Sequence, residues 1–196
     1  MSDLALPSLI DRAIGYAARA HDGQQRKAGN IPYIAHPVAV AMSLQAMGCP
    51  EIVVAAALLH DTVEDTDVTL ADIRATFGDE IADIVAGVTE PDKGNGWEER
   101  KQYLIEKLRW APLEVKLVAA ADKFHNLSHI SHSHLKHGEV AWDRFSRGPA
   151  QQAWYYRQVT ASILENVAEP EQYPIFEKLS AAVNMLFAGI TPQPPA

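Results

Sequence analysis

The stretch His60-Asp61 followed by Glu64-Asp65 gathers one imidazole and three carboxylates in a short part of the chain. Adjacent carboxylates are costly to bury unless a cation neutralises them, so this group points to a divalent metal ion. The apolar run at residues 52–59 contains no helix breaker and predicts a buried helix. If this helix continues through both doublets, His60 and Glu64 lie one turn apart, as do Asp61 and Asp65.

Two residues outside this stretch could complete a metal site. His36 stands just before Pro37, which suits the first position of a helix. Asp122 follows the apolar residues 117–121, where a carboxylate is unexpected, and Asn126 lies one turn beyond it. Two imidazoles and two carboxylates suit manganese, iron or zinc and leave positions open for water and substrate oxygens. Each residue alone could be a helix cap or part of an ion pair, but their combination favours a metal site.

Composition limits the classes of protein to consider. The chain has 196 residues, enough for one domain with a real core. Its net charge of -8 argues against a nucleic-acid surface, and its single cysteine, Cys49, fits a reducing compartment. We find no signal peptide and no apolar stretch near the ~20 residues that span a bilayer. We therefore expect a cytoplasmic protein with neither nucleic acid nor membrane as a partner.

Helical patterns recur along the chain, whereas strand patterns hardly occur. The fold class predicted is all-α, a compact single-domain helical bundle over residues 1–190, with a disordered tail at 191–196. Helix starts and stops predict these helices: 8–21, 37–47, the central one after Pro50, 70–77, one from 79, 97–110, 113–127, 151–167 and 174–188. The segment 128–150 is polar and irregular, so we expect it to be rich in loops.

Four ordered motifs carry a resemblance to a known family. They read AxxAHDGQQRKAGNIPYIAHP, AAALLHDTVEDTDVT, FGDEIADIVAGVTE and KLVAAADKFHNL. The chain resembles the HD-domain phosphohydrolases, among them the RelA/SpoT-type alarmone hydrolases, and most closely the stand-alone small alarmone hydrolases. The resemblance implies an HD-type helical bundle and a manganese-dependent hydrolase. Its substrate would be a small nucleotide such as (p)ppGpp, from which it would release pyrophosphate and leave the nucleoside 5′-di- or triphosphate.

The resemblance also assigns roles to particular residues. The implied ligands of Mn²⁺, or of another divalent transition metal, are His36, His60, Asp61 and Asp122. Glu64 and Asp65 would orient and deprotonate the attacking water. The residues implied to contact the nucleotide are Arg26, on the purine, Lys27, near phosphates, Asn126, near the ribose, and His129, Tyr155 and Arg157.

Several alternatives stay open at this level. The family's usual serine is Ala28 here, and Leu127-Ser128-His129 replaces its usual Met/Leu-Arg-Thr/Asp, so the base could be guanine or adenine. The chain could instead be an HD phosphatase acting on a 5′-nucleotide or NADPH, or a catalytically silent nucleotide-binding module. A monomer and a homodimer are both compatible with the sequence. The histidines His125, His129, His132, His134 and His137 could form a second metal site or a polar rim.

Overall fold

A computed structural model describes residues 7–26, 30–91 and 94–194 of the chain. These residues form ten α-helices and two short 3-10 helices, and they contain no strand beyond one isolated bridge between Gln25 and Pro32. The predicted all-α fold is therefore confirmed. The chain divides into two compact units, residues 1–86 and 87–196. The single domain over residues 1–190 stays a prediction.

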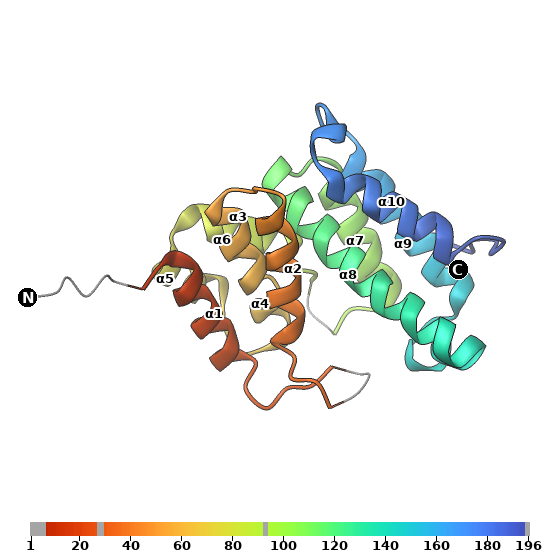
Figure 1. Ribbon diagram of the computed structural model, residues 1–196, viewed down its shortest axis with the longest axis horizontal. Coiled ribbons are helices and arrows are strands. Elements are labelled where there is room, and N and C mark those ends of the chain that lie inside the picture. The colour runs from red at the N-terminus through yellow and green to blue at the C-terminus, as the bar shows by residue number, and fades with distance from the viewer. Residues whose placement is uncertain (1–6, 27–29, 92–93, 195–196) are drawn as a thin grey trace, which may run out of the picture. The chain divides into compact units, whose positions relative to one another are not determined.

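Helix α3 (Glu51–Leu59) is the centre of the first unit. Helices α1 (Leu9–Ala20) and α2 (Ala35–Ala46) both pack against it (Figure 1). Every residue from Val53 to Leu59 is buried, as the unbroken apolar run predicts. Because burial of apolar surface is the main favourable term in folding, this helix anchors the unit.

Local capping sets the ends of the next two helices. Thr69 is the N-cap residue of helix α5 (Leu70–Phe77). Its hydroxyl accepts a hydrogen bond from the backbone amide of Asp72, and the Asp72 carboxylate accepts one from the backbone amide of Thr69. The helix ends at Gly78, whose φ of 91° suits a residue without a Cβ. Helix α6 (Asp79–Val88) follows at once and crosses the boundary of the two units. Both ends of the predicted helix 70–77 are thus confirmed.

The helix considered for the two doublets is not continuous. Helix α3 ends at Leu59, and a single turn, α4 (Thr62–Asp65), follows it. Asp61 is the N-cap residue of α4, and the Thr62 hydroxyl donates a hydrogen bond of 2.7 Å to the Leu59 carbonyl. That bond satisfies one of the carbonyls that the end of α3 leaves without a helical partner. The continuous helix that the sequence analysis considered is therefore not found.

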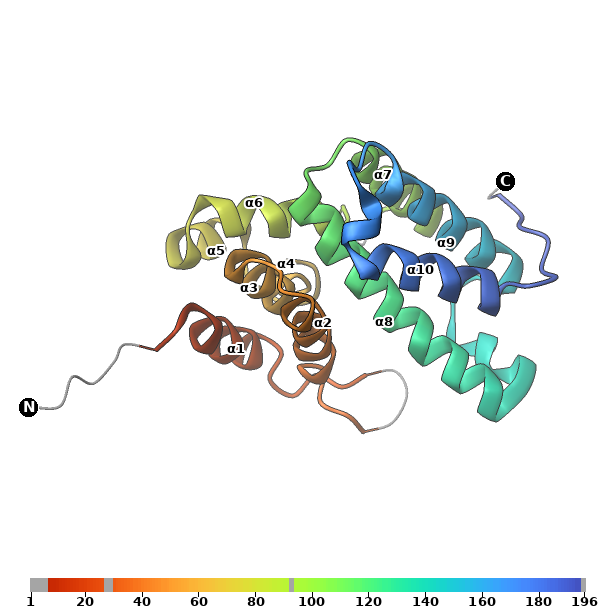
Figure 2. The same ribbon diagram turned by 45° about the horizontal axis from the view of Figure 1, so that its top comes forward.

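Helix α8 (Leu113–His137) is the centre of the second unit. It packs against α9 (Pro149–Leu164), α10 (Pro174–Leu186) and the 3-10 helix η1 (Gly138–Arg144). Figure 2 shows α9 and α10 alongside it. Helix α7 (Trp97–Arg109) packs against α9, and a short 3-10 helix, η2 (Pro170–Gln172), precedes α10.

A buried lysine joins two helix ends in this unit. The Lys116 side chain lies in the core, and its ammonium donates to the carbonyl of Arg109, at 3.2 Å, and to the carbonyl of Glu165. These carbonyls lie at the C-terminal ends of α7 and α9, where a cation is favourable. Burial lowers the pKa of Lys116 from its ordinary value.

Two predicted boundaries are wrong. Residues 128–137 continue α8, and residues 138–144 form η1, so 128–150 is mostly helical. The Ser128 hydroxyl donates back to the Phe124 carbonyl, and α8 ends at Gly138, whose φ is 64°. Helix α2 begins at Ala35, so His36 lies inside its first turn instead of before it.

The described helices are too short or too polar to span a membrane, and the chain after α10 ends without a further helix in the part that the structure describes. The predicted disorder of residues 191–196 stays a prediction, and residues 195–196 lie outside the described residues. The Gln193 amide donates a hydrogen bond of 3.1 Å to the Ala150 carbonyl.

Candidate metal centre

Two buried imidazoles converge on the carboxylate of Asp61 in the first unit. The Nε2 atom of His60 lies 3.1 Å from Oδ1 of Asp61, and Nε2 of His36 lies 3.4 Å from Oδ2. The two rings meet edge to face, with centroids 5.2 Å apart. The break between α3 and α4 positions Asp61, and the first turn of α2 positions His36. The structure thus brings together three of the four predicted metal ligands.

The tautomer of His60 bears on what this group can bind. Its Nδ1 atom lies 2.8 Å from the carbonyl oxygen of Ala57, which can only accept, so Nδ1 carries the proton. A neutral His60 therefore presents the lone pair of Nε2 to a carboxylate, and two acceptors then face each other. Protonation of the ring resolves this contact, and so does a cation held between the two atoms. The arrangement fits a metal site whose histidine is oriented by a backbone carbonyl.

Electrostatics around Asp61 favour the ionised carboxylate. Burial by itself raises the pKa of Asp61, but the charge and hydrogen bonds of His60 and His36 outweigh it and hold the pKa well below its ordinary value. The side chain is 16% exposed. Asp61 is therefore a charged acceptor at neutral pH, as a metal ligand must be.

Tyr33 is a member of this site that the sequence prediction missed. Its hydroxyl lies 2.8 Å from Oδ2 of Asp61 and 2.9 Å from Oδ2 of Asp65. Burial, followed by the charges of the two carboxylates, raises the pKa of Tyr33 far above its ordinary value, so the hydroxyl stays protonated. The only signal in the sequence is its place in the loop, three residues before His36.

The predicted water-activating pair lies in α4. Glu64 and Asp65 are both half-buried, and the backbone carbonyl of Asp65 accepts a hydrogen bond of 2.7 Å from the Gln24 side chain. The guanidinium of Arg26 lies over the Tyr33 ring, 5.6 Å from its centroid. Arg26 and Asp65 therefore both contact Tyr33. The predicted phosphate contact Lys27 lies outside the described residues.

The fourth predicted ligand, Asp122, lies in α8 of the second unit. Its Oδ2 atom accepts a hydrogen bond of 2.7 Å from the Lys123 ammonium, and its Oδ1 atom accepts one of 2.6 Å from the Asn126 side-chain amide. Burial alone lowers the pKa of Lys123, but Asp122, Tyr155 and Glu90 outweigh it and raise the pKa well above its ordinary value. The sequence prediction placed Asn126 one turn from Asp122, as found, but it missed Lys123.

The remaining predicted contacts occupy different environments in the second unit. His129 is exposed, and its ring centroid lies 4.6 Å from that of His125. Tyr155 is buried, with the Lys101 ammonium 4.8 Å from its ring centroid, and burial raises its pKa. Arg157 donates a hydrogen bond of 2.9 Å to the Phe187 carbonyl, at the C-terminal end of α10. Their roles toward a nucleotide stay predictions, as does the role of the histidines at 125–137.

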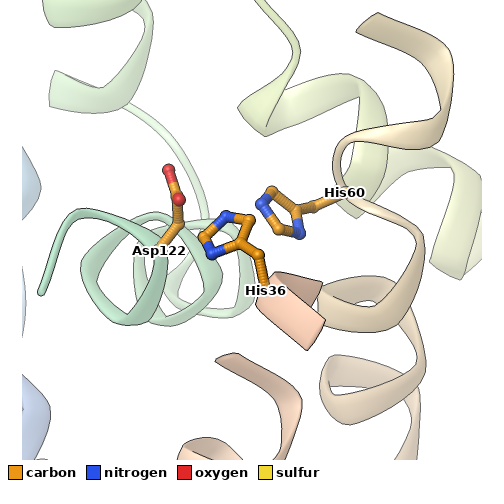
Figure 3. A group of neighbouring side chains, drawn as sticks. All are labelled: His36, His60 and Asp122. Atoms are coloured by element: carbon orange, nitrogen blue, oxygen red, sulfur yellow. The ribbon is translucent and has the colours of Figure 1, made fainter. Parts of the chain in front are cut away.

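Figure 3 draws the side chains of His36, His60 and Asp122, each of which is buried and offers a nitrogen or oxygen ligand atom. Imidazole nitrogen combined with carboxylate oxygen suits divalent transition metals, whereas soft ions prefer thiolates. The chain's only cysteine, Cys49, is a free thiol between α2 and α3. The donor set therefore fits a divalent metal, without selecting one element.

Comparison with known proteins places the chain in a family. A family model described as HD domain matches residues 13–145, which is most of the chain. The guanosine-3′,5′-bis(diphosphate) 3′-pyrophosphohydrolase MESH1 of Danio rerio is 42% identical over 129 residues, a match that covers 63% of this chain and 70% of that protein. MESH1 of Homo sapiens is 43% identical over 122 residues, which cover 61% and 68% of the two chains.

Other relatives are much longer, and solved structures share the fold. A probable 3′-pyrophosphohydrolase of the same nucleotide from Synechocystis is 42% identical over 125 residues, but the match covers only 16% of that protein. The crystal structure of lmo0812 from Listeria monocytogenes matches with a TM-score of 0.72 and 42% identity, covering 80% of this chain and 96% of the other. A metazoan ortholog of SpoT, reported to hydrolyse ppGpp, matches with a TM-score of 0.73 and 29% identity, covering 93% and 96%.

The predicted resemblance is thereby confirmed. The sequence match to the two MESH1 proteins covers more than two thirds of each of them, and the HD domain model includes all four predicted metal ligands. The chain therefore belongs to the HD domain family, and within it to the group of alarmone hydrolases that includes MESH1.

Proposed function

We propose that this protein is a metal-dependent 3′-pyrophosphohydrolase of a purine alarmone such as ppGpp. The observation that carries the proposal is the pair of buried imidazoles on the Asp61 carboxylate, with Asp65 joined to it through Tyr33. The MESH1 relatives, over 40% identical across this region, are named for that reaction. The substrate is a small nucleotide, and we place the protein in the cytoplasm, in line with its single free cysteine.

The proposed ligands of the metal are the four predicted from the sequence, His36, His60, Asp61 and Asp122. Two imidazoles and two carboxylates form a mixed nitrogen and oxygen set, for which Mn²⁺ is our first choice. When bound, a divalent ion supplies Lewis-acid chemistry, which makes water more acidic and withdraws charge from the diphosphate under attack. The Ala57 carbonyl, which fixes the Nδ1 proton of His60, would keep Nε2 available as a ligand.

The residues of α4 would handle the proton. A water oxygen attacks the diphosphate, the bond between the diphosphate and the ribose 3′ oxygen breaks, and pyrophosphate leaves. Asp65, with Glu64 beside it, accepts the proton of the attacking water, because a carboxylate within hydrogen-bond reach is a suitable general base. The 3′ oxygen takes up one proton and becomes a hydroxyl, and Asp65 gives up the proton that it received, so that atoms and charges balance.

Other residues would bind the nucleotide. Arg26 presents a planar guanidinium that can stack on the purine, a role that an ammonium cannot take. Lys27 would contact phosphates, and Asn126 would reach the ribose. The predicted contacts His129, Tyr155 and Arg157 would complete the nucleotide site.

The test is turnover by purified protein with Mn²⁺ against ppGpp, pppGpp, ppApp, NADPH and simple nucleotides. We expect pyrophosphate, and not orthophosphate, as the product from an alarmone. Orthophosphate release from NADPH or a 5′-nucleotide would instead identify a phosphatase of another nucleotide. Tight binding by isothermal titration without turnover would identify a nucleotide sensor. Comparison of ppGpp with ppApp settles which base is accepted.

A further inference from the structure

The Tyr33 hydroxyl contacts two carboxylates that have different roles in the proposed reaction. It lies 2.8 Å from Oδ2 of Asp61, the proposed metal ligand, and 2.9 Å from Oδ2 of Asp65, the proposed base. A hydroxyl has one proton to donate, so it cannot form two full hydrogen bonds to two ionised carboxylates at once. Instead, its single proton is shared between two oxygens that otherwise repel each other.

The ring of Tyr33 is held from several sides, so its hydroxyl is a fixed point. The His21 ring lies against it with centroids 4.8 Å apart, and the His36 ring meets it edge to face, with centroids 6.0 Å apart. The Tyr33 backbone amide donates to the Gln24 carbonyl at 2.9 Å. Gln24 in turn donates from its side chain to the backbone carbonyl of Asp65. Both ends of Tyr33 are therefore tied to the segment that carries the proposed base.

Arg26 contacts the ring of Tyr33. Its guanidinium lies over the Tyr33 ring, at a distance typical of a cation–π contact. One residue thus contacts the proposed purine-stacking arginine with its ring, and the metal ligand and the base with its hydroxyl. The two contacts use different atoms, so they can be removed separately.

We propose that Tyr33 is a positioning residue that sets the distance between Asp61 and Asp65 through its hydroxyl and orients Arg26 through its ring. The proposal rests on the function proposed above, because it assumes that Asp61 binds the metal and that Asp65 accepts the proton. Tyr33 is not a catalytic residue, because it acts through the side chains of Asp61, Asp65 and Arg26. It is not expected to touch the reacting atoms.

The first test is Tyr33→Phe, which removes the hydroxyl and keeps the ring. We expect the kcat for the alarmone to fall on the order of 10- to 100-fold and the Kd for Mn²⁺ to rise about 10-fold, as for other residues that orient metal ligands. The KM should change less than about 3-fold, because the ring still supports Arg26. Tyr103→Phe is the matched control, since Tyr103 is an exposed tyrosine of α7 in the other unit.

The second test is Tyr33→Leu, which removes the ring as well. We expect it to lower kcat like Tyr33→Phe and, in addition, to raise the KM about 10-fold through the loss of the Arg26 contact. A thermal melt establishes that each variant is folded. Unchanged kcat and unchanged Mn²⁺ Kd in Tyr33→Phe overturn the proposal. If the wild-type protein hydrolyses no nucleotide, the proposed function fails, and the Mn²⁺ Kd of Tyr33→Phe alone then decides the role of Tyr33.

Discussion

The carboxylates of Asp61 and Asp122, one in each unit, are neutralised in different ways. Asp61 lies among imidazoles and a tyrosine hydroxyl, and two further carboxylates, Glu64 and Asp65, follow it in the chain. Asp122 has a cation of its own, the Lys123 ammonium, 2.7 Å away, and an amide donor in Asn126. The contacts of Asp61 are thus imidazoles and a hydroxyl, whereas Asp122 has an ammonium at ion-pair distance.

This difference bears on how each carboxylate would respond to a bound metal ion. Burial of a carboxylate is costly unless a cation or hydrogen bonds compensate it, and the proposed metal ion would supply such a cation beside Asp61. Asp122 is already satisfied and would have to share its carboxylate between Lys123 and the ion. The ion would thus be the cationic partner of Asp61, whereas Asp122 has an ammonium partner in Lys123 whether or not an ion is bound. Substitutions of the two carboxylates and of their partners should therefore have different consequences.

The largest effect is expected from Asp61→Ala. Removal of a proposed metal ligand should lower kcat by about 10³-fold or more, while the fold survives, because the substitution also removes the cost of burying a carboxylate. Turnover with Mn²⁺ and circular dichroism measure the two effects. Asp67→Ala, at an exposed aspartate just after α4, is the control and should behave like the wild type. Global unfolding of the Asp61→Ala protein would contradict a dedicated metal role.

Unlike Asp61→Ala, the substitution Lys123→Met should lower the stability of the protein. It leaves the buried Asp122 carboxylate without its cation, and breaking a buried ion pair on one side costs about 3 kcal/mol. We expect this loss in the free energy of unfolding, measured with urea in EDTA, and a clearly smaller loss in saturating Mn²⁺, which replaces the missing charge. Lys136→Met, at an exposed lysine of the same helix, is the control. An equal loss with and without Mn²⁺ would separate Asp122 from the metal.

Removal of the metal from the wild-type protein should have the next largest effect on the free energy of unfolding. Saturation with Mn²⁺ at about 100 times its Kd should raise the free energy of unfolding by about 2.7 kcal/mol relative to EDTA. The Asp61→Ala protein should show almost none of this gain, because its ligand set is incomplete. Urea titrations of both proteins, with Mn²⁺ and with EDTA, measure the difference. Equal gains in both proteins would mean that the ion binds elsewhere.

The smallest effect is expected from Asn126→Ala. This change removes the amide that donates 2.6 Å to Oδ1 of Asp122, but the Lys123 ion pair remains. One lost hydrogen bond to a charged acceptor should lower the free energy of unfolding by about 1.5 kcal/mol in EDTA. Ser128→Ala, which removes an exposed hydroxyl two residues further along α8, should change it by less than about 0.5 kcal/mol. If the two variants lose equal stability, Asn126 does not support Asp122.

Much of the fold could be predicted from the sequence where local signals were unambiguous. Thr69 and Gly78 mark the ends of α5, because the cap and the positive φ depend on those residues alone. The serines and histidines after Leu127 suggested a loop, yet α8 continues to Gly138. Serine and histidine are only weak helix formers and not helix breakers, and the packing of the buried Leu127 and Ile130 favours continuation of the helix. Such packing cannot be read from a local pattern.

In the candidate site, too, some residues could be predicted from the sequence and others depend on tertiary contacts. His36, His60 and Asp61 were predicted from residue type and motif, and the structure brings them together. Tyr33 and Lys123 were missed, because a tyrosine in a loop and a lysine beside an aspartate are common in any sequence. Their importance comes from contacts with the carboxylates, and these contacts depend on where the helices place them. The proximity of His36, His60 and Asp61 was predictable, whereas the contacts of Tyr33 and Lys123 with the carboxylates were not.

The interruption between α3 and α4 makes the order of the histidine and the aspartate significant. His60 still belongs to the end of α3, where its ring reaches back to the carbonyl of Ala57, whereas Asp61 already starts α4 and reaches Tyr33. Exchange of the two residues would turn a carboxylate toward a carbonyl oxygen, so that two electron-rich groups face each other. An inverted pair would thus preserve the composition of the site and lose its geometry, so the dipeptide has a direction and is not merely a pair of ligands.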